Sequence, residues 1–196
     1  MKTYTSTPSS ILVVSLIEAK LHCKIDVSTD DALITNLISA ATHLSEEYTN
    51  RFFINTDVVM YCSEWKDLDW LFKSNVSFDI ASDTLEYLAP NDNNIYTIWN
   101  VSNYNVITEY QPSQVIISEN ISFPSVQKRT DAIKISYKAG YGAAASDVPE
   151  EIKQAILLTI GNWYANRESV VVGRIATELP LNVKWLLDTY KVQIVS

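Results

Sequence analysis

Apolar residues recur at helical spacing near both ends of the chain, whereas the middle of the chain alternates apolar and polar residues. The first helix is expected to begin at Ser15, because Ser15 and Glu18 have the spacing of a capping box. It is expected to end near Lys24. Its narrow apolar stripe consists of Leu16, Ala19 and Cys23.

A second and stronger helix is expected next, capped by Ser28 or Thr29. Asp30 and Asp31 are favourable in its first turn, because the helix dipole is positive at that end. The helix is expected to stop at Asn50, a residue that tolerates the left-handed conformation. Its apolar stripe consists of Leu33, Ile34, Leu37, Ile38, Ala41 and Leu44.

Two further helices are expected toward the C-terminus. Asp147 is expected to cap the first of them, with Pro149 in its first turn and Glu150 at the capping-box position. A helix that is apolar on so much of its circumference must be covered on several sides, by its own chain or by neighbouring copies. Its stripe consists of Ile152, Ala155, Ile156, Thr159, Ile160 and Trp163. A short helix is then expected from about Leu181 to Tyr190.

The middle of the chain is rich in β-branched and aromatic residues and is interrupted by turn clusters. The run from Pro90 to Asn94 is expected to be a hairpin turn, because Asn and Asp accept positive φ. Ile133 and Ile135 alternate with polar neighbours, as in a half-buried strand. The strands expected are Thr56–Cys62, Val76–Ile80, Thr84–Leu88, Ile95–Trp99, Asn105–Tyr110, Gln114–Ser118 and Ala132–Tyr137.

These elements predict an α+β fold, in which a small bundle of three to four helices carries an antiparallel β segment inserted between the second and third helices. Residues 1–10 are polar and are interpreted as a flexible arm. The helical core is expected to comprise residues 11–53 and 138–190, and the inserted β segment residues 54–137. Residues 191–196 form a C-terminal tail that alternates apolar and polar residues, as a strand does.

The composition and net charge of the chain exclude some classes of function. The chain is 47% hydrophobic, so it can fill a core, and its net charge of −8 argues against a general affinity for duplex DNA. Between Thr56 and Thr130 there are ten acidic and four basic residues, which suggests an acidic β segment on a nearly neutral helical base. No apolar run is long enough to predict a membrane span.

The chain lacks a recognisable catalytic constellation. The carboxylate pairs at 30–31 and 150–151 lie in first turns of expected helices, where capping and the dipole account for them. Neither histidine has a nucleophile in a strained turn, and the glycines at 140 and 142 lack phosphate-loop spacing. The two cysteines lack the spacing of a metal site. We therefore expect no enzymatic activity, no cofactor and no metal.

Several segments in order resemble the head–tail connector (adaptor) family of long-tailed bacteriophages. The resemblance covers roughly the residues outside the β segment. The segments that carry it are Leu16-Ile17-Glu18-Ala19-Lys20, Asp30-Asp31-Ala32-Leu33-Ile34, Glu47-Tyr48-Thr49-Asn50-Arg51, Tyr137-Lys138-Ala139-Gly140-Tyr141-Gly142, Val148-Pro149-Glu150-Glu151-Ile152-Lys153-Gln154-Ala155, Trp163-Tyr164, Asn166-Arg167-Glu168, Leu179-Pro180, Leu186-Leu187 and Tyr190.

The resemblance implies a structural virion protein, assembled in the host cytoplasm, that forms a dodecameric homo-oligomeric ring at the head–tail junction. Such a ring docks beneath the portal protein, extends the DNA channel and offers a platform for a tail-completion or tail-terminator protein. Genomic DNA passes through without sequence-specific binding. The subunit-interface residues implied are Trp163, Tyr164, Arg167, Glu168, Leu186 and Leu187, and the portal-binding residues implied are Tyr190, Val192 and Ile194.

Other functions remain open from the residues alone. A tail-completion or tail-terminator protein is the nearest virion alternative. From a different class, a carbohydrate-binding β module would use Trp65, Trp70 and Trp99 as an aromatic platform. A carboxylate-driven hydrolase would require two acids held across a cleft, and no such pair is identified by the sequence.

Overall fold

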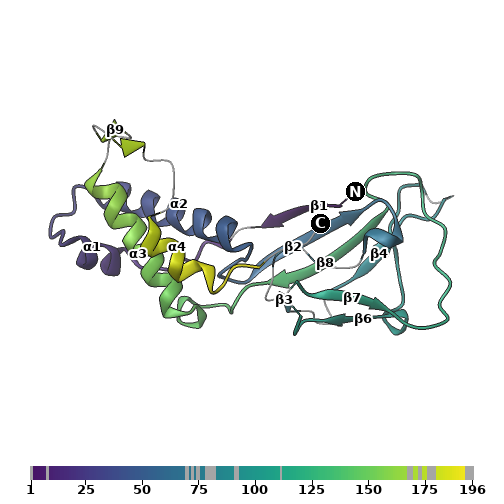
Figure 1. The fold of residues 1–196 in the computed structure, drawn as a ribbon. Helices are drawn as coiled ribbons and strands as arrows, with labels where there is room; N and C mark the ends of the chain where they lie inside the picture. The colour runs from purple at the N-terminus through teal and green to yellow at the C-terminus, as the bar shows by residue number, and fades with distance from the viewer. Residues whose placement is uncertain are drawn as a thin grey trace. The chain divides into compact units, whose positions relative to one another are not determined.

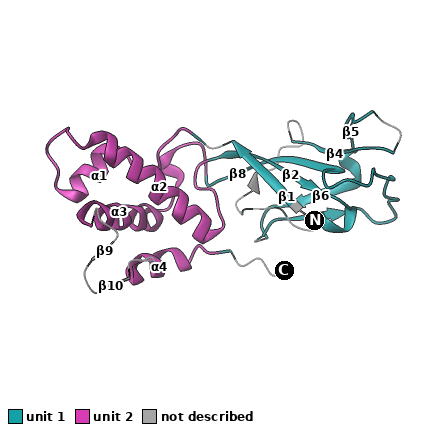
Figure 2. Ribbon diagram, turned by 90° about the horizontal axis from the view of Figure 1, so that it is seen from above, with its two compact units in different colours: residues 1–9, 55–141, 192–196 teal, residues 10–54, 142–191 magenta. Residues whose placement is uncertain are grey.

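The computed structural model has the predicted α+β fold, with four α-helices and antiparallel sheets (Figure 1). The chain divides into two compact units (Figure 2). Unit 1 comprises Met1–Ser9, Asn55–Tyr141 and Val192–Ser196, and unit 2 comprises Ser10–Ile54 and Gly142–Lys191. The structure describes residues 2–7, 9–68, 71, 73, 76–77, 83–90, 93–110, 112–166, 170–171, 174–175 and 180–192.

Unit 2 is helical. Its core helices α2 (Asp31–Thr49) and α3 (Glu150–Ala165) pack against each other, and α1 (Leu16–Cys23) and α4 (Leu181–Asp188) both pack on α3. In both views α3 lies between α1 and α4 (Figures 1 and 2). The strands β9 (Val170–Val171) and β10 (Arg174–Ile175) pair in the connection from α3 to α4.

Unit 1 is built on a six-stranded antiparallel sheet whose path runs β1-β2-β8-β4-β5, with β3 also pairing with β8. A separate hairpin joins β6 to β7. Bounds of the strands are β1 (Lys2–Thr7), β2 (Thr56–Cys62), β3 (Val76–Ser77), β4 (Leu85–Tyr87), β5 (Thr97–Ile98), β6 (Tyr104–Ile107), β7 (Gln114–Ile117) and β8 (Ile133–Ala139). Each of the seven strands expected from the sequence overlaps one of these.

The N-terminal segment differs from its prediction. The polar composition of residues 1–10 predicts a flexible arm, but Lys2–Thr7 form β1 and pair with β2 along their whole length. Backbone hydrogen bonds carry this pairing, so a strand with little apolar content can still join the sheet. The sheet is therefore completed by a strand that precedes the helices in sequence. Of the C-terminal tail, residues 193–196 lie outside the described part of the chain.

The core of each unit follows the predicted periodicity. In α2, Ile34, Ile38 and Ala41 are fully buried, as expected, whereas Leu33 and Leu44 at the margins of the stripe are exposed. In α3, the fully buried positions are Ile152, Ala155, Ile156 and Ile160. In unit 1, alternate residues of β8 face the core, and Ile133, Ile135 and Ala139 are fully buried.

Helix ends follow local chemistry in part. The expected cap of α2 at Ser28 or Thr29 is wrong, because α2 begins after Asp30, without a side-chain cap. The capping box at Ser15 is present: the backbone N of Glu18 donates to Ser15 Oγ at 3.2 Å, and the backbone N of Ser15 donates to Glu18 Oε2 at 2.7 Å. Asn50 ends α2 with a φ of 55°, as predicted. The start of α3 was predicted less well. Asp147 lies in a 3-10 turn and accepts from the backbone N of Ala144, so α3 begins after Pro149 without a side-chain cap.

The glycine turn before α3 has a steric cause. At Gly142, a Cβ would lie 2.1 Å from Asp147 Oδ2, so no larger residue fits while Asp147 keeps its position. Gly140 has a φ of 154°, which other residues adopt rarely. Backbone sterics therefore account for both glycines of this turn.

Replacing Ser15 with alanine is expected to lower the free energy of unfolding of the helical unit by about 1 kcal/mol, because the first turn of α1 loses its cap. Bonding to Ser15 also lowers the pKa of Glu18 from its ordinary value of 4.5. This part of the stability is therefore present above pH 4.5 and is lost as the pH falls through the lower, folded-state pKa. Urea unfolding at neutral and acidic pH measures both effects.

Ser39→Ala is the matched control for Ser15→Ala. Ser39 is an exposed mid-helix serine of α2 whose hydroxyl donates to the carbonyl of Thr35, a bond that adds little to a helix. Equal losses for the two variants would contradict a stabilising role for the cap.

Candidate interaction surfaces

The outward face of α1 carries two large apolar side chains beside Glu18 and His22. Ile17 and Leu21 lie one helical turn apart, and each is 79% exposed. A surface helix normally turns its apolar stripe inward and its polar residues outward. In α1 only Ala19 is fully buried, and the side chains of Ile17 and Leu21 are left for solvent or for a partner.

A second apolar pair lies on α4. Leu181 and Trp185 are also one turn apart and are 61% and 67% exposed. The opposite side of the helix carries Val183 and Leu187, which are fully buried. An exposed tryptophan beside an exposed leucine is typical of an interaction site, since Trp is enriched among the residues that dominate binding energy.

Polar contacts fix α1 to its unit. Lys20 Nζ lies 2.6 Å from Asp31 Oδ1, which ties α1 to the start of α2. The Tyr164 hydroxyl donates to Asp30 Oδ2 at 2.6 Å, which ties the end of α3 to the same place. His22 packs beside Gly161, where an added Cβ would lie 3.4 Å from its Nε2. These contacts hold Ile17 and Leu21, the α1 pair, near the C-terminal end of α3.

A different set of contacts fixes α4. The Tyr48 hydroxyl donates to Asp188 Oδ1 at 2.5 Å, and Arg51 Nε donates to the carbonyl of Tyr190 at 2.5 Å. The Tyr190 hydroxyl donates to Glu151 Oε2 at 2.9 Å, in the first turn of α3. Leu181 and Trp185, the α4 pair, are therefore held near the N-terminal end of α3, away from the α1 pair.

The bond to Asp188 raises the pKa of Tyr48 to about 12 from its ordinary 10.0, because losing the proton would place two negative charges together. A raised folded-state pKa means that this stabilisation is complete below pH 10 and is lost as the pH rises toward about 12. Ultraviolet titration of the tyrosines is expected to lose one of its most alkaline steps in Tyr48→Phe.

Tyr96→Phe is the comparison for Tyr48→Phe, because burial raises the pKa of Tyr96 to about 12 as well. Each variant is expected to remove one step and leave the other. A titration curve of Tyr48→Phe that retains both steps would contradict the bond to Asp188.

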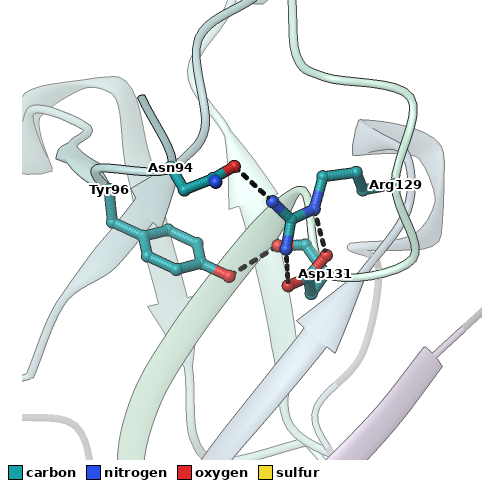
Figure 3. A network of polar contacts seen from close by, with 4 residues as sticks. All are labelled: Asn94, Tyr96, Arg129 and Asp131. Atoms are coloured by element: carbon teal, nitrogen blue, oxygen red, sulfur yellow. Dashed lines mark hydrogen bonds and ion pairs between the residues drawn. The ribbon is translucent and has the colours of Figure 1, made fainter. Parts of the chain in front are cut away.

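In unit 1 a polar network joins a long loop to the β4–β5 hairpin (Figure 3). Arg129 donates through Nε and Nη2 to the two carboxylate oxygens of Asp131, at 2.9 and 2.7 Å, and through Nη1 to Asn94 Oδ1 at 2.5 Å. The Tyr96 hydroxyl donates to the carbonyl of Asp131 at 2.6 Å. The bond from Arg129 lowers the pKa of Asp131. The four residues bond to one another, which favours a structural role.

The aromatic residues of unit 1 form a packed cluster. The Trp65 ring lies 4.6 Å from that of Trp99 and 5.5 Å from that of Phe123, and Trp65 Nε1 donates to the carbonyl of Pro124. Trp99 is only 6% exposed and stacks on Tyr104. A sugar platform needs open ring faces, and these rings cover one another. Trp70, the third tryptophan considered for a platform, lies outside the described residues.

Charge is shared evenly between the units. Unit 1 contains eleven acidic and seven basic residues and unit 2 twelve and eight, so each carries −4. The segment 56–130 suggested an acidic β module on a nearly neutral base. That interpretation is wrong for the folded units, because β1 and β8 add lysines to the sheet and unit 2 carries its own surplus of acids.

Within the described ranges, no three His, Cys, Asp or Glu side chains gather closely enough to hold a metal ion. Among the helices that the structure describes, none is both long and apolar enough to cross a membrane.

Part of the chain matches a known protein family. Residues 13–82, which contain α1, α2 and β2, match the model of the phage gp6-like head–tail connector proteins. The resemblance inferred from the ordered sequence segments is thereby confirmed. A comparison with curated protein sequences found no match.

The chain is similar over its whole length to chains from gene transfer agent (GTA) particles. One is from the neck of an empty GTA particle computed with C6 symmetry (18% identity, TM-score 0.77), and one is from the virion of a native GTA particle (17%, 0.77). A third is from a native neck computed with C12 symmetry (17%, 0.75). Each alignment covers 100% of this chain and 97% of the other. At these identities the likeness establishes the fold.

The interface residues predicted for the chain fall into three groups. Trp163, Tyr164 and Leu186 are half-buried, and their contact with another subunit stays a prediction. Leu187 is fully buried among the helices of its own unit, so it contributes to the core and not to an open surface. Arg167 and Glu168 lie outside the described residues.

The predicted portal-binding residues are placed in part. Tyr190 is half-buried and bonded to Glu151, and Val192 is only 6% exposed. Ile194 lies outside the described residues. Sequence reasoning missed the exposed pairs of α1 and α4, although Ile17, Leu21, Leu181 and Trp185 all stand at one-turn spacing.

Proposed function

We propose that this connector forms a closed ring, of twelve copies, in the neck of a phage-like particle. The whole-length similarity to neck chains of GTA particles, in necks computed with C6 and C12 symmetry, is the observation that carries the proposal. The match of residues 13–82 to the phage gp6-like head–tail connector model supports it independently. The ring would lie beneath the portal, extend the DNA channel and hold a tail-completion or tail-terminator protein on its other side.

The charge of the chain supports a passive role toward DNA. Both units carry a net charge of −4, and strong phosphate binding requires a surplus of lysine and arginine. An acidic channel wall repels the duplex and allows it to slide. The family is a structural one, so we infer that the connector acts by assembly and not by catalysis.

The proposal is tested by deleting the gene for the chain in a producing strain and imaging the particles. We expect filled heads and free tails that do not join, with joining restored when the full chain is supplied. Reconstruction of restored necks is expected to place one ring of the chain at the head–tail junction. Normal tailed particles without the chain, or a position elsewhere in the particle, would overturn the proposal.

We also propose that the C-terminal tail contributes to the portal contact by adding a strand to an exposed sheet edge. Deleting residues 193–196 leaves Val192, which is buried in the chain, in place. The truncated connector is expected to form rings but to attach poorly to portal-bearing heads in a pull-down. Unchanged attachment would remove the tail from the portal interface.

A further inference from the structure

We propose that the apolar pair of α1 in one copy packs against the apolar pair of α4 in the next copy, and that this contact closes the ring. The inference rests on the proposed ring function and assigns the two surfaces that meet. The α1 pair is Ile17 and Leu21, and the α4 pair is Leu181 and Trp185.

The two pairs occupy different places on one unit. The α1 pair is held near Gly161 and the α4 pair near Glu151, at opposite ends of α3. Ten residues of helix separate these points, which is roughly 15 Å along the axis. A two-fold dimer needs one self-complementary patch, whereas a ring built by rotation needs two different patches that fit each other. Unit 2 carries two different patches, which is the arrangement that a ring requires.

The two pairs also match each other in shape. Both consist of two large apolar side chains at positions i and i+4 of an eight-residue helix. Side chains at this spacing form the ridges that interdigitate in the commonest class of helix packing. Trp185 then supplies the large anchoring residue and Leu21 the surface on which it rests. Burial of the four side chains removes from water the most exposed apolar groups of α1 and α4.

The charges beside the two pairs are complementary. In each helix the apolar pair is followed three residues later by an exposed charged residue, Lys24 after Leu21 and Asp188 after Trp185. These charges are opposite, so a roughly parallel crossing of the two helices places an ammonium beside a carboxylate. Asp188 accepts a hydrogen bond from Tyr48, and a carboxylate can accept from further donors at the same time. In the same parallel crossing, two copies of α1, or two copies of α4, would bring like charges together.

The test uses paired charge substitutions in the full-length connector. Leu21→Glu alone and Trp185→Lys alone are each expected to lower the fraction of chain found in rings at least tenfold, because a charge is placed in an apolar contact. The double variant Leu21→Glu/Trp185→Lys is expected to recover ring formation, since every contact then faces Glu with Lys. Leu21→Glu/Trp185→Glu is the matched control and is expected to stay defective. Ala40→Glu, at an exposed position of α2, is expected to behave as wild type.

Rings are counted by mass in solution and in necks of particles restored with each variant. All substituted positions are exposed, so circular dichroism is expected to match wild type. Variants that leave wild-type ring numbers, or a double variant of opposite charge that recovers nothing, would overturn the α1–α4 contact while the ring function stands. Loss of head or tail attachment with intact rings would reassign these faces to another neck protein. If the wild-type chain is absent from rings both in solution and in necks, the proposed function fails and this contact fails with it.

Discussion

Replacing Ile135 with alanine is expected to destabilise unit 1 by about 2–5 kcal/mol, the range for removing a fully buried isoleucine side chain down to Cβ. Ile135 occupies the middle of β8 and stands opposite Met60 of β2 and Leu85 of β4. All three side chains are fully buried, so they form one continuous layer across the three central strands. Alanine leaves a cavity in the centre of that layer, which the rigid ladders on both sides prevent from collapsing.

Hydrogen exchange of the strand amides measures this loss within unit 1 directly. Ile135→Val removes one methylene and is expected to cost about 0.5–1.5 kcal/mol, which grades the effect. Lys138→Ala lies on the same strand and removes an exposed ion pair with Asp57, which is worth about 0–1 kcal/mol. If the strand amides of Ile135→Ala exchanged no faster than those of Lys138→Ala, the buried layer would not be what stabilises the sheet.

The sequence predicts the sheet well wherever side chains alternate. The bounds expected for Thr56–Cys62 are those observed for β2, because one face of this strand is buried and the other is not. The strand β1 has no such signal, since Thr and Ser dominate it and its pairing is made by the backbone. Polar composition alone cannot separate a mobile arm from an edge strand, because both leave hydroxyl side chains in water.

Helix boundaries show the same division between local and non-local causes. Ser15 and Glu18 form their box from residues three apart, so spacing alone predicts it. Asp147 has the same local signature but accepts from Ala144, because the turn at Gly142 brings that backbone close. A cap is predictable when its partner is the helix itself, and less so when a preceding turn competes for the same oxygen.

The interaction surfaces were the hardest feature to predict. The broad apolar circumference of α3 correctly indicated that the helix needs cover on several sides, and its own chain supplies much of that cover through α1, α2 and α4. The most exposed large apolar side chains of the four helices, Ile17, Leu21, Leu181 and Trp185, lie on the two short helices. Leu187 and Trp185 are both large apolar residues of α4, yet one is fully buried and the other 67% exposed. Hydrophobicity indicates that a residue will be covered, but it does not indicate whether the cover is its own chain or another copy.

Replacing Ile156 with alanine is expected to destabilise unit 2 by about 2–5 kcal/mol and to lower ring assembly with it. Ile156 is fully buried in the middle of α3, the helix on which α1, α2 and α4 all pack. Because α3 fixes the spacing of the two exposed pairs, loosening it disturbs both of the faces that we propose to meet in the ring. Hydrogen exchange of the helical amides and the mass of the assembled ring measure the two consequences. Gln154→Ala, an exposed substitution on the same helix, is expected to change the free energy of unfolding by no more than about 0.5 kcal/mol and to leave the mass of the ring unchanged. Normal ring assembly by an Ile156→Ala chain whose helical unit is measurably loosened would contradict a requirement for α3 to hold the two faces in place.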